Sequence, residues 1–189
     1  MAVRPPDFLM TADDILEFWF SEESQARWFD STPEYDRLVK ERFEGAWQQA
    51  RNGELADWEE MADSAVALVI LLDQMPLNMF RDKPESFSTE EQSRQVARRA
   101  IGNGFDIELA DEYMAFFYLS FMHSESLADQ DRSVMLFETA GLENNLKWAR
   151  SHREIVRRFG RFPHRNQILG RESTPEEVEW LNSPDGFNP

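Results

Sequence analysis

Helix starts and helix stops recur along the whole sequence, and this feature constrains the fold more than any other. Thr11, Thr32 and Thr174 are each followed closely by acidic residues or proline, as helix N-caps are. Gly53 suits the position just after a helix, where a left-handed backbone is common. No stretch sustains the alternation of apolar and polar residues that marks a strand. The sequence therefore predicts an all-α fold.

The sequence marks the bounds of several helices clearly. One is expected over 59–75, apolar over much of its circumference and ended by Pro76. Others are expected over 111–122 and 142–159. The short links between them favour antiparallel helix pairs packed in chain order. We expect seven to eight helices in stacked antiparallel pairs.

Three further residues are assigned to helix ends or faces. Ser88, with Glu91 three residues later, is expected to cap one helix, and Ser124 is expected to cap a later one. Leu38 is placed on the apolar stripe of the helix that Thr32 begins. No linker long enough to divide domains is found, so we expect a single domain over 1–189, with frayed tails at 1–10 and 183–189.

Composition excludes several classes of protein. The chain has no cysteine, which rules out a disulfide framework, a thiolate zinc site and a cysteine nucleophile. No apolar run approaches the length of a membrane span, and the start lacks an export signal, so a cytoplasmic location is expected. The chain is acidic, with a net charge of −16, which argues against nucleic-acid binding and gives no reason to expect a membrane partner.

That net charge hides a basic segment. Residues 147–171 contain eight Lys and Arg residues and one acid, so this segment carries +7 and the rest of the chain −23. Either the segment docks against acidic helices of the same fold, or part of it forms an anion site. Both alternatives stay open from the sequence.

Polar residues interrupt apolar sequence in three places. The first is 71–81, where Asp73 and Gln74 sit at the end of a helix expected to be buried and Asn78 and Arg81 follow. A carboxylate there needs a partner, because the helix dipole and burial both disfavour it. An arginine or histidine elsewhere in the chain is the natural candidate. Alternatively, the side chains of Asp73 and Gln74 satisfy loop backbone amides.

The second place is the end of the aromatic-rich helix at 111–122. This helix delivers His123 to its end, with Glu125 two residues later. An imidazole and a carboxylate can act as a general base and its orienting group. The same pair can equally tie helices together, because a His-x-Glu sequence is common in inert proteins.

The third place is 152–166, rich in arginine and histidine. His152 lies on the buried stripe of its helix, and the residues after Gly160 alternate cations with Phe162 and Pro163. Arginine supplies planar, paired donors for carboxylate or phosphate. The candidate ligand-binding residues of this segment are His152, Arg153, Arg157, Arg161, His164, Arg165 and Asn166.

Several catalytic devices are missing from the sequence. It contains no glycine-rich phosphate loop, no nucleophile elbow and no His-Glu-x-x-His metal helix. With three scattered histidines and no cysteine, neither a metal nor a cofactor is expected.

The chain resembles the bacterial domain-of-unknown-function family 924. The resemblance is carried by LEFWF at 16–20, LLDQMP at 71–76, HSE at 123–125, RFGRFPHRN at 158–166 and LGREST at 169–174. It implies a tetratricopeptide-repeat-like fold of stacked helix pairs and assigns no catalytic residues. The family has an arginine where this chain has Leu77, so a role for a cation at that position is not carried over.

Three functions follow as hypotheses. The first is a non-catalytic binding or interaction module, whose polar residues gather on one concave face around an anionic small molecule or an acidic peptide or protein. The second is an enzyme, a hydrolase or isomerase with His123 or His164 as general base. The third is an internal polar network that fixes how the helices pack.

Overall fold

The computed structural model describes residues 10–184 and residue 186. Within these residues the chain is all-helical, as predicted. The α-helices are α1 (Ala12–Trp19), α2 (Glu22–Gln25), α3 (Pro33–Arg51), α4 (Ala62–Val69), α5 (Met75–Met79), α6 (Glu90–Gly102), α7 (Asp111–Met122), α8 (Leu127–Thr139), α9 (Glu143–Phe159) and α10 (Pro175–Leu181). A π-helical turn, η2 (Ile70–Gln74), joins α4 to α5. The 3₁₀ turns are η1 (Ala56–Glu60), η3 (Pro84–Phe87), η4 (Asp106–Glu108) and η5 (Pro163–Arg165).

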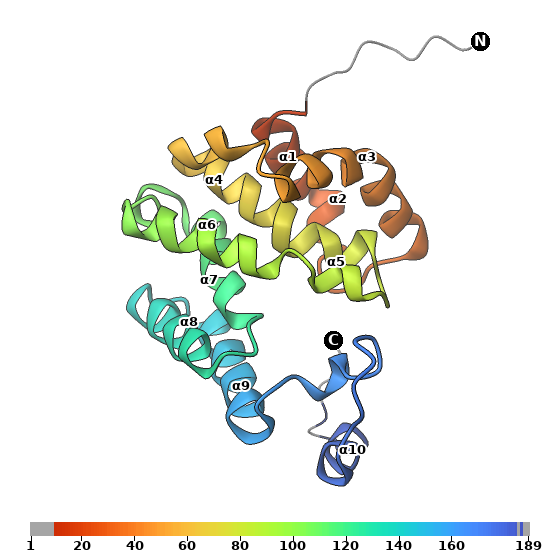
Figure 1. Ribbon diagram of the computed structural model, residues 1–189. Helices are drawn as coiled ribbons and strands as arrows, with labels where there is room; N and C mark the ends of the chain where they lie inside the picture. Colours follow the sequence, from red (N-terminus) through yellow and green to blue (C-terminus); the bar gives the residue numbers. More distant parts are fainter. Residues whose placement is uncertain (1–9, 185, 187–189) are drawn as a thin grey trace, which may run out of the picture.

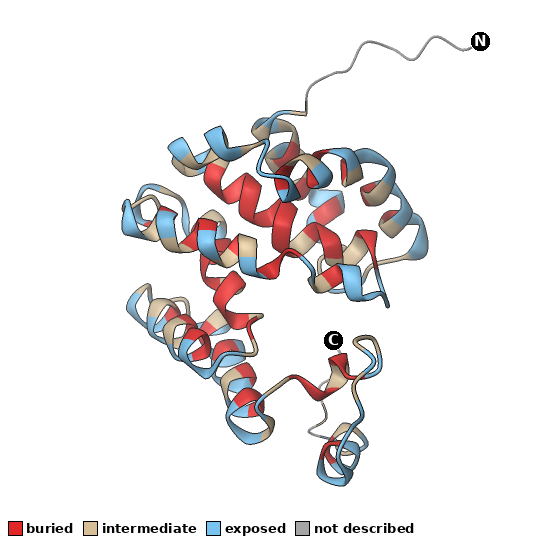
Figure 2. Cartoon of the chain, viewed as in Figure 1, coloured by how far each residue is buried: buried red, intermediate tan, exposed pale blue. Residues whose placement is uncertain are grey.

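Helices that follow one another pack side by side. α6 contacts α7, α7 contacts α8, and α8 packs most extensively on α9 (Figure 1). Figure 2 shows the buried residues concentrated along α4, η2 and α7, which form the centre of the main apolar core. The tetratricopeptide-like stacking that the resemblance implies stays a prediction.

The residues after α9 form a separate arm in Figure 1, which we call the C-terminal strap (residues 160–181). Its apolar residues Phe162 and Trp180 pack with Ile155 and Val156 of α9 in a small cluster of their own, apart from the main core. Gly160 ends α9 with a left-handed backbone (φ 70°), which redirects the chain into the strap.

The helix expected over 59–75 differs from its prediction in one respect: Pro76 does not end it. The chain passes through the π turn into α5, with Pro76 in the first turn of α5. In an uninterrupted α-helix the missing N–H of Pro76 would leave the carbonyl of Leu72 without its donor. Here Thr89 supplies that donor, because its hydroxyl donates to Leu72 O at 2.6 Å. The proline is therefore accommodated within the helical path.

Three of the predicted caps are confirmed, whereas Ser88 and Ser124 are not the caps of their helices. Thr11, Thr32 and Thr174 each accept a backbone N–H at the start of α1, α3 and α10. Ser88 is not the cap of α6. Its hydroxyl donates to Glu85 O at 2.8 Å, and the N-cap position falls to Thr89.

Leu38 does not belong to the buried stripe of α3, because it is 42% exposed. The frayed tails expected at 1–10 and 183–189 fall mostly outside the described residues. Ser183, which is described, donates its N–H to Trp180 O at 3.0 Å. None of the described helices combines the length and the apolar character that crossing a lipid bilayer requires.

Candidate ligand site

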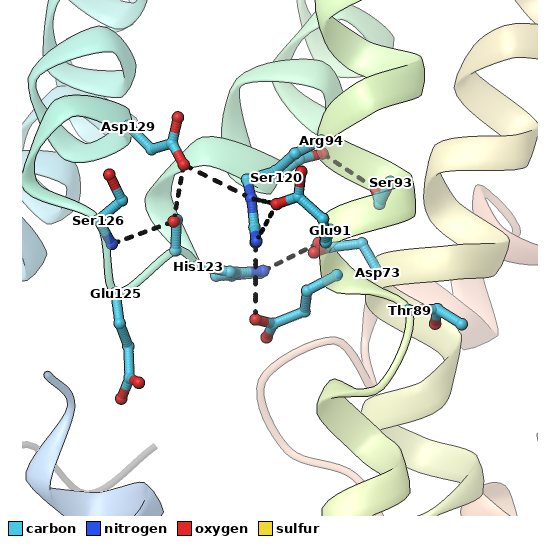
Figure 3. Close-up of polar contacts among 12 residues, drawn as sticks. Asp73, Thr89, Glu91, Ser93, Arg94, Ser120, His123, Glu125, Ser126 and Asp129 are labelled. Carbon is cyan, nitrogen blue, oxygen red and sulfur yellow. Dashed lines mark hydrogen bonds and ion pairs between the residues drawn. The ribbon is translucent and has the colours of Figure 1, made fainter.

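Three consecutive residues that follow α7 tie different parts of the molecule together. His123 is the C-cap of α7, and Ser124 and Glu125 precede α8. We call these three residues the His-Ser-Glu turn. Each side chain bonds to a different segment, so the turn is the centre of the site. Figure 3 shows the contact of His123 with Asp73.

The first residue of the turn bonds to the π turn. His123 Nδ1 lies 2.9 Å from Asp73 Oδ2, and Gln74 Nε2 donates to the same oxygen at 2.5 Å. Asp73 is fully buried, and among the described residues its Oδ1 has no hydrogen-bond donor. Because Nδ1 donates its hydrogen bond to Asp73, Nε2 is the ring nitrogen that is left for another partner. It makes no hydrogen bond to any described residue, and the side chain is 17% exposed.

Burial and charge compete at this pair. Burial alone would raise the pKa of Asp73, but the charge and hydrogen bond of His123 hold that pKa below its ordinary value. Burial would likewise lower the pKa of His123, but the carboxylate of Asp73, aided by the charge of Glu90, raises it above its ordinary value. Both shifts favour a carboxylate on Asp73 and a proton on His123. Each side chain of the pair can be buried because the other one compensates for the loss of its hydration.

A second buried pair links the start of α6 to the strap. Arg165 meets Glu90 through two contacts, NH1 to Oε2 at 3.1 Å and NH2 to Oε1 at 3.0 Å. The guanidinium also lies over the rings of Phe87 and Phe162, with its carbon 4.3 and 4.8 Å from their centroids. Burial raises the pKa of Glu90, and the charge of Arg165 opposes that rise.

The second residue of the turn bonds to α8, so Ser124 is not the N-cap that was predicted. Its hydroxyl donates to Asp129 Oδ2 at 2.8 Å, and the N-cap of α8 is Ser126. Asp129 also pairs with Arg94 at 3.6 Å and with Arg98, both from α6 (Figure 3 shows the Arg94 contact). This part of the site fixes α6 against α8.

The third residue of the turn bonds to the strap. Glu125 Oε2 accepts from Arg171 NH1 at 2.7 Å, and its Oε1 accepts from Arg171 NH2 at 2.8 Å. The backbone N–H of Phe162 also donates to Oε1 at 2.8 Å. Burial would raise the pKa of Glu125, but Arg171 and the Phe162 N–H keep it below its ordinary value. The strap is thus held within two residues of His123.

The strap has its own ion pair. Arg161 binds both carboxylate oxygens of Glu177, at 2.7 and 2.8 Å, and the buried Asn166 donates to Glu177 at 3.2 Å. Hydrogen bonding from Arg161 holds the pKa of Glu177 at about 2. Arg161 also donates to the carbonyl of Glu172, so it closes the strap on itself.

Of the other two histidines, His152 belongs to α9 and His164 to the strap, and both are held neutral. His152 Nδ1 lies 2.9 Å from Trp148 O within α9, and the rings of His152 and His164 lie 5.6 and 5.5 Å from that of Phe162. Burial lowers the pKa of His152 to about 4 and that of His164 to about 3. The Glu125 carboxylate near His164 opposes this shift only in part.

Four predicted site residues do not join this cluster. Asn78 and Arg81 bond instead to Asp36 of α3, at 2.7 and 2.5 Å. Arg153 pairs with Asp131 on α8, and Arg157 pairs with its helix neighbour Glu154, both at exposed positions. The sequence places Arg153 and Arg157 one turn apart on α9, but both pair with acids outside the His-Ser-Glu turn.

Three of the remaining predicted residues meet acids that the sequence did not single out: Arg165 binds Glu90, and Arg161 and Asn166 bind Glu177. Glu90 and Asp129 resemble ordinary first-turn acids of α6 and α8. The one signal that could have revealed them is the spacing of Glu90, Arg94 and Arg98, four residues apart on one face of α6. A shallow hollow of about 320 Å³ lies elsewhere, against α1 and Tyr113.

Comparison with known proteins assigns the chain to a family. The sequence profile of a family described as bacterial protein of unknown function, DUF924, matches residues 15–185. The chain belongs to the DUF924 family. A solved structure described as a protein of unknown function, ATU0120, from Agrobacterium tumefaciens is 42% identical to this chain in sequence. The alignment covers 90% of this chain and 96% of that one, with a TM-score of 0.86. A comparison with curated proteins found no match.

Proposed function

We propose that this DUF924 protein is a binding module for a small anion, and that the ligand is held at the Nε2 of His123. The observation that carries the proposal is that the two nitrogens of the His123 ring have different surroundings. Nδ1 is fixed by a fully buried carboxylate, while Nε2 has no partner among the described residues. An imidazolium held in this way presents a fixed, charge-assisted donor to an anionic oxygen.

The electrostatics of the surroundings support an anionic ligand. The charges of Asp73 and Glu90 raise the pKa of His123 above its ordinary value, although burial opposes this shift. Arg165 Nε is a buried donor that makes no hydrogen bond to the described residues. Buried polar atoms without partners are rare in native proteins and suggest a role beyond packing.

Ion pairing limits the size of the ligand. Arg161, Arg165 and Arg171 are each bound to an internal carboxylate through two nitrogen–oxygen contacts. The basic segment is thus largely used to hold the strap, as the internal-network hypothesis expects. A carboxylate or phosphate group, or the acidic end of a peptide, fits the donors that remain better than an extended acidic surface does.

Two substitutions of one residue test the proposal. His123→Asn retains a donor near the position of Nδ1 and removes the donor at Nε2, whereas His123→Gln does the reverse. NMR would follow the backbone amides of the His-Ser-Glu turn in each protein, and the His123 ring in the wild type, while phosphate, acetate, a dicarboxylate and a short acidic peptide are titrated to about 10 mM. Amide shifts in the wild type that are retained in His123→Gln and lost in His123→Asn support the proposal. If no anion perturbs the His123 ring, the module hypothesis is wrong.

An enzyme is the second candidate, favoured by the same Asp73–His123 geometry. A buried carboxylate that fixes one ring nitrogen while the other faces a substrate is the arrangement of many proton-transfer sites. His164 suits this role poorly, because a base whose pKa is about 3 has little basicity at neutral pH. Hydrolysis of model esters and phosphoesters, compared between wild type and His123→Asn, separates the two candidates. Activity that depends on His123 favours the enzyme, and ligand binding without turnover favours the module.

A further inference from the structure

The C-terminal strap (residues 160–181) adjoins the site without belonging to the main core. Phe162 and Trp180 pack against the end of α9 in their own cluster, which is separate from the core that holds α4 to α7. Beyond α9, the strap is held to the rest of the molecule by hydrogen bonds and ion pairs to Glu90 and Glu125 and by the contact of Arg165 with the ring of Phe87. A segment attached in this way can move without exposing the main core.

Two Arg–carboxylate pairs hold the strap down. Arg165 binds both oxygens of Glu90, and Arg171 binds both oxygens of Glu125. We call these two pairs the latch. The carboxylates come from α6 and from the His-Ser-Glu turn, and both arginines come from the strap. Opening the strap therefore breaks ion pairs, which re-form in the same geometry when it closes.

The latch lies beside His123. Glu125 is two residues from His123 and also accepts the N–H of Phe162, so the start of the strap is fixed to the same turn that carries the imidazole. The charges of Arg165 and Glu90 both act on the His123 ring. With its side chain only 17% exposed, His123 lies in a partly covered position.

The chain has a pivot at the start of the strap. Gly160 takes a left-handed conformation (φ 70°), and nothing lies within 4 Å of the place where a Cβ would stand. Glycine moves between backbone conformations at lower cost than any other residue. A rotation at this residue would carry the strap away from Glu90 and Glu125.

We propose that the C-terminal strap is a lid over His123, closed by the Arg165–Glu90 and Arg171–Glu125 latch and hinged at Gly160. This inference rests on the proposed function, since it regulates access to the same imidazole. An anion that enters the site must pass the closed lid, so the latch sets the rate of binding and release.

The test needs no ligand, so the lid and the binding site can fail independently. The chain has three histidines, His123, His152 and His164, and diethyl pyrocarbonate modification at pH 8 can be mapped to each by mass spectrometry. Glu125→Gln and the double variant Glu125→Gln/Arg171→Gln would be compared with Arg157→Gln. That control breaks an exposed pair, Arg157–Glu154, which lies wholly within α9.

Hydrogen exchange would be measured on the same proteins. The lid predicts that the latch variants expose the strap amides and speed modification of His123 by about tenfold, while exchange in α4 to α7 is unchanged. Arg157→Gln is expected to match the wild type. Three results would overturn the proposal: unchanged His123 modification in both latch variants, strap opening without faster modification, or exchange that rises in the strap and in α4 to α7 together.

Discussion

The hydroxyl of Thr89 donates to the carbonyl oxygen of Leu72 at 2.6 Å, across the junction between α6 and the π turn. The same hydroxyl accepts the indole N–H of Trp47 at 3.1 Å. It lets a proline follow the π turn within one continuous helical path. The π turn also directs the side chain of Asp73 at His123. Such widened helical turns are frequent at functional sites.

Thr89→Val should destabilise the protein by about 2–4 kcal/mol, because it leaves a buried carbonyl and a buried indole N–H without partners. Urea unfolding measures the change. Ser88→Ala is the matched control, since that hydroxyl is exposed, and its effect should stay within about 0.5 kcal/mol. Equal effects of the two variants would contradict the role given to Thr89.

Asp73→Asn should lower the pKa of His123 below its ordinary value of 6.5, because burial then acts without the opposing carboxylate. In the wild type, the pKa of His123 is raised above its ordinary value. Its contribution to stability is therefore complete below pH 6.5 and is lost as the pH rises through the pKa of the folded protein. The pKa of Asp73 is lowered, so its contribution to stability is present above pH 3.8 and is lost as the pH falls through the pKa of the folded protein. NMR titration of His123 gives the pKa, and an unchanged value in Asp73→Asn would refute the coupling.

Arg161→Leu should loosen the strap and leave the main core folded. The pKa of Glu177 is held at about 2. The contribution of Glu177 to stability is therefore present above pH 4.5 and is lost as the pH falls toward 2. Without Arg161 this acid transition should move to higher pH. Trp180 fluorescence, with the other tryptophans replaced by phenylalanine, reports the transition. If anion binding at His123 disappears while the strap stays ordered, Arg161 binds the ligand instead.

Two glycine substitutions should have opposite effects on stability. Gly45 lies in the middle of α3 with open space around it, so Gly45→Ala should stabilise the protein by about 1 kcal/mol. Gly160 has a φ of 70°, so Gly160→Ala should destabilise by about 1–2 kcal/mol. Thermal unfolding of both variants tests the pair of predictions. Stabilisation by Gly160→Ala would show that the left-handed turn is not required.

Much of the fold follows from local signals in the sequence. The caps at Thr11, Thr32 and Thr174 and the stop at Gly160 could be predicted, because each depends on residues within one helical turn. Pro76 could not be placed correctly, because its accommodation depends on Thr89, which lies in a different helix. Local rules fail where a tertiary hydrogen bond replaces a helical one.

The site was predictable only in part, for a similar reason. The need of Asp73 for a cationic partner follows from its position near a helix end, and the structure supplies His123. That Arg81 would bind Asp36 instead could not be foreseen, because both residues are unremarkable surface charges in the sequence. Which of many arginines meets which of many acids depends on how the helices pack. The sequence alone does not carry that information.

His123, Ser124 and Glu125 follow one another directly in the sequence, and this has a consequence for engineering the chain. One residue added to or removed from α7 would rotate His123 by about 100° about the helix axis and separate it from Asp73. Glu125 and Ser124 would turn with it and lose their partners at the same time. Insertions and fluorescent tags are therefore better placed in the loop before α3, next to Phe29, which is 97% exposed.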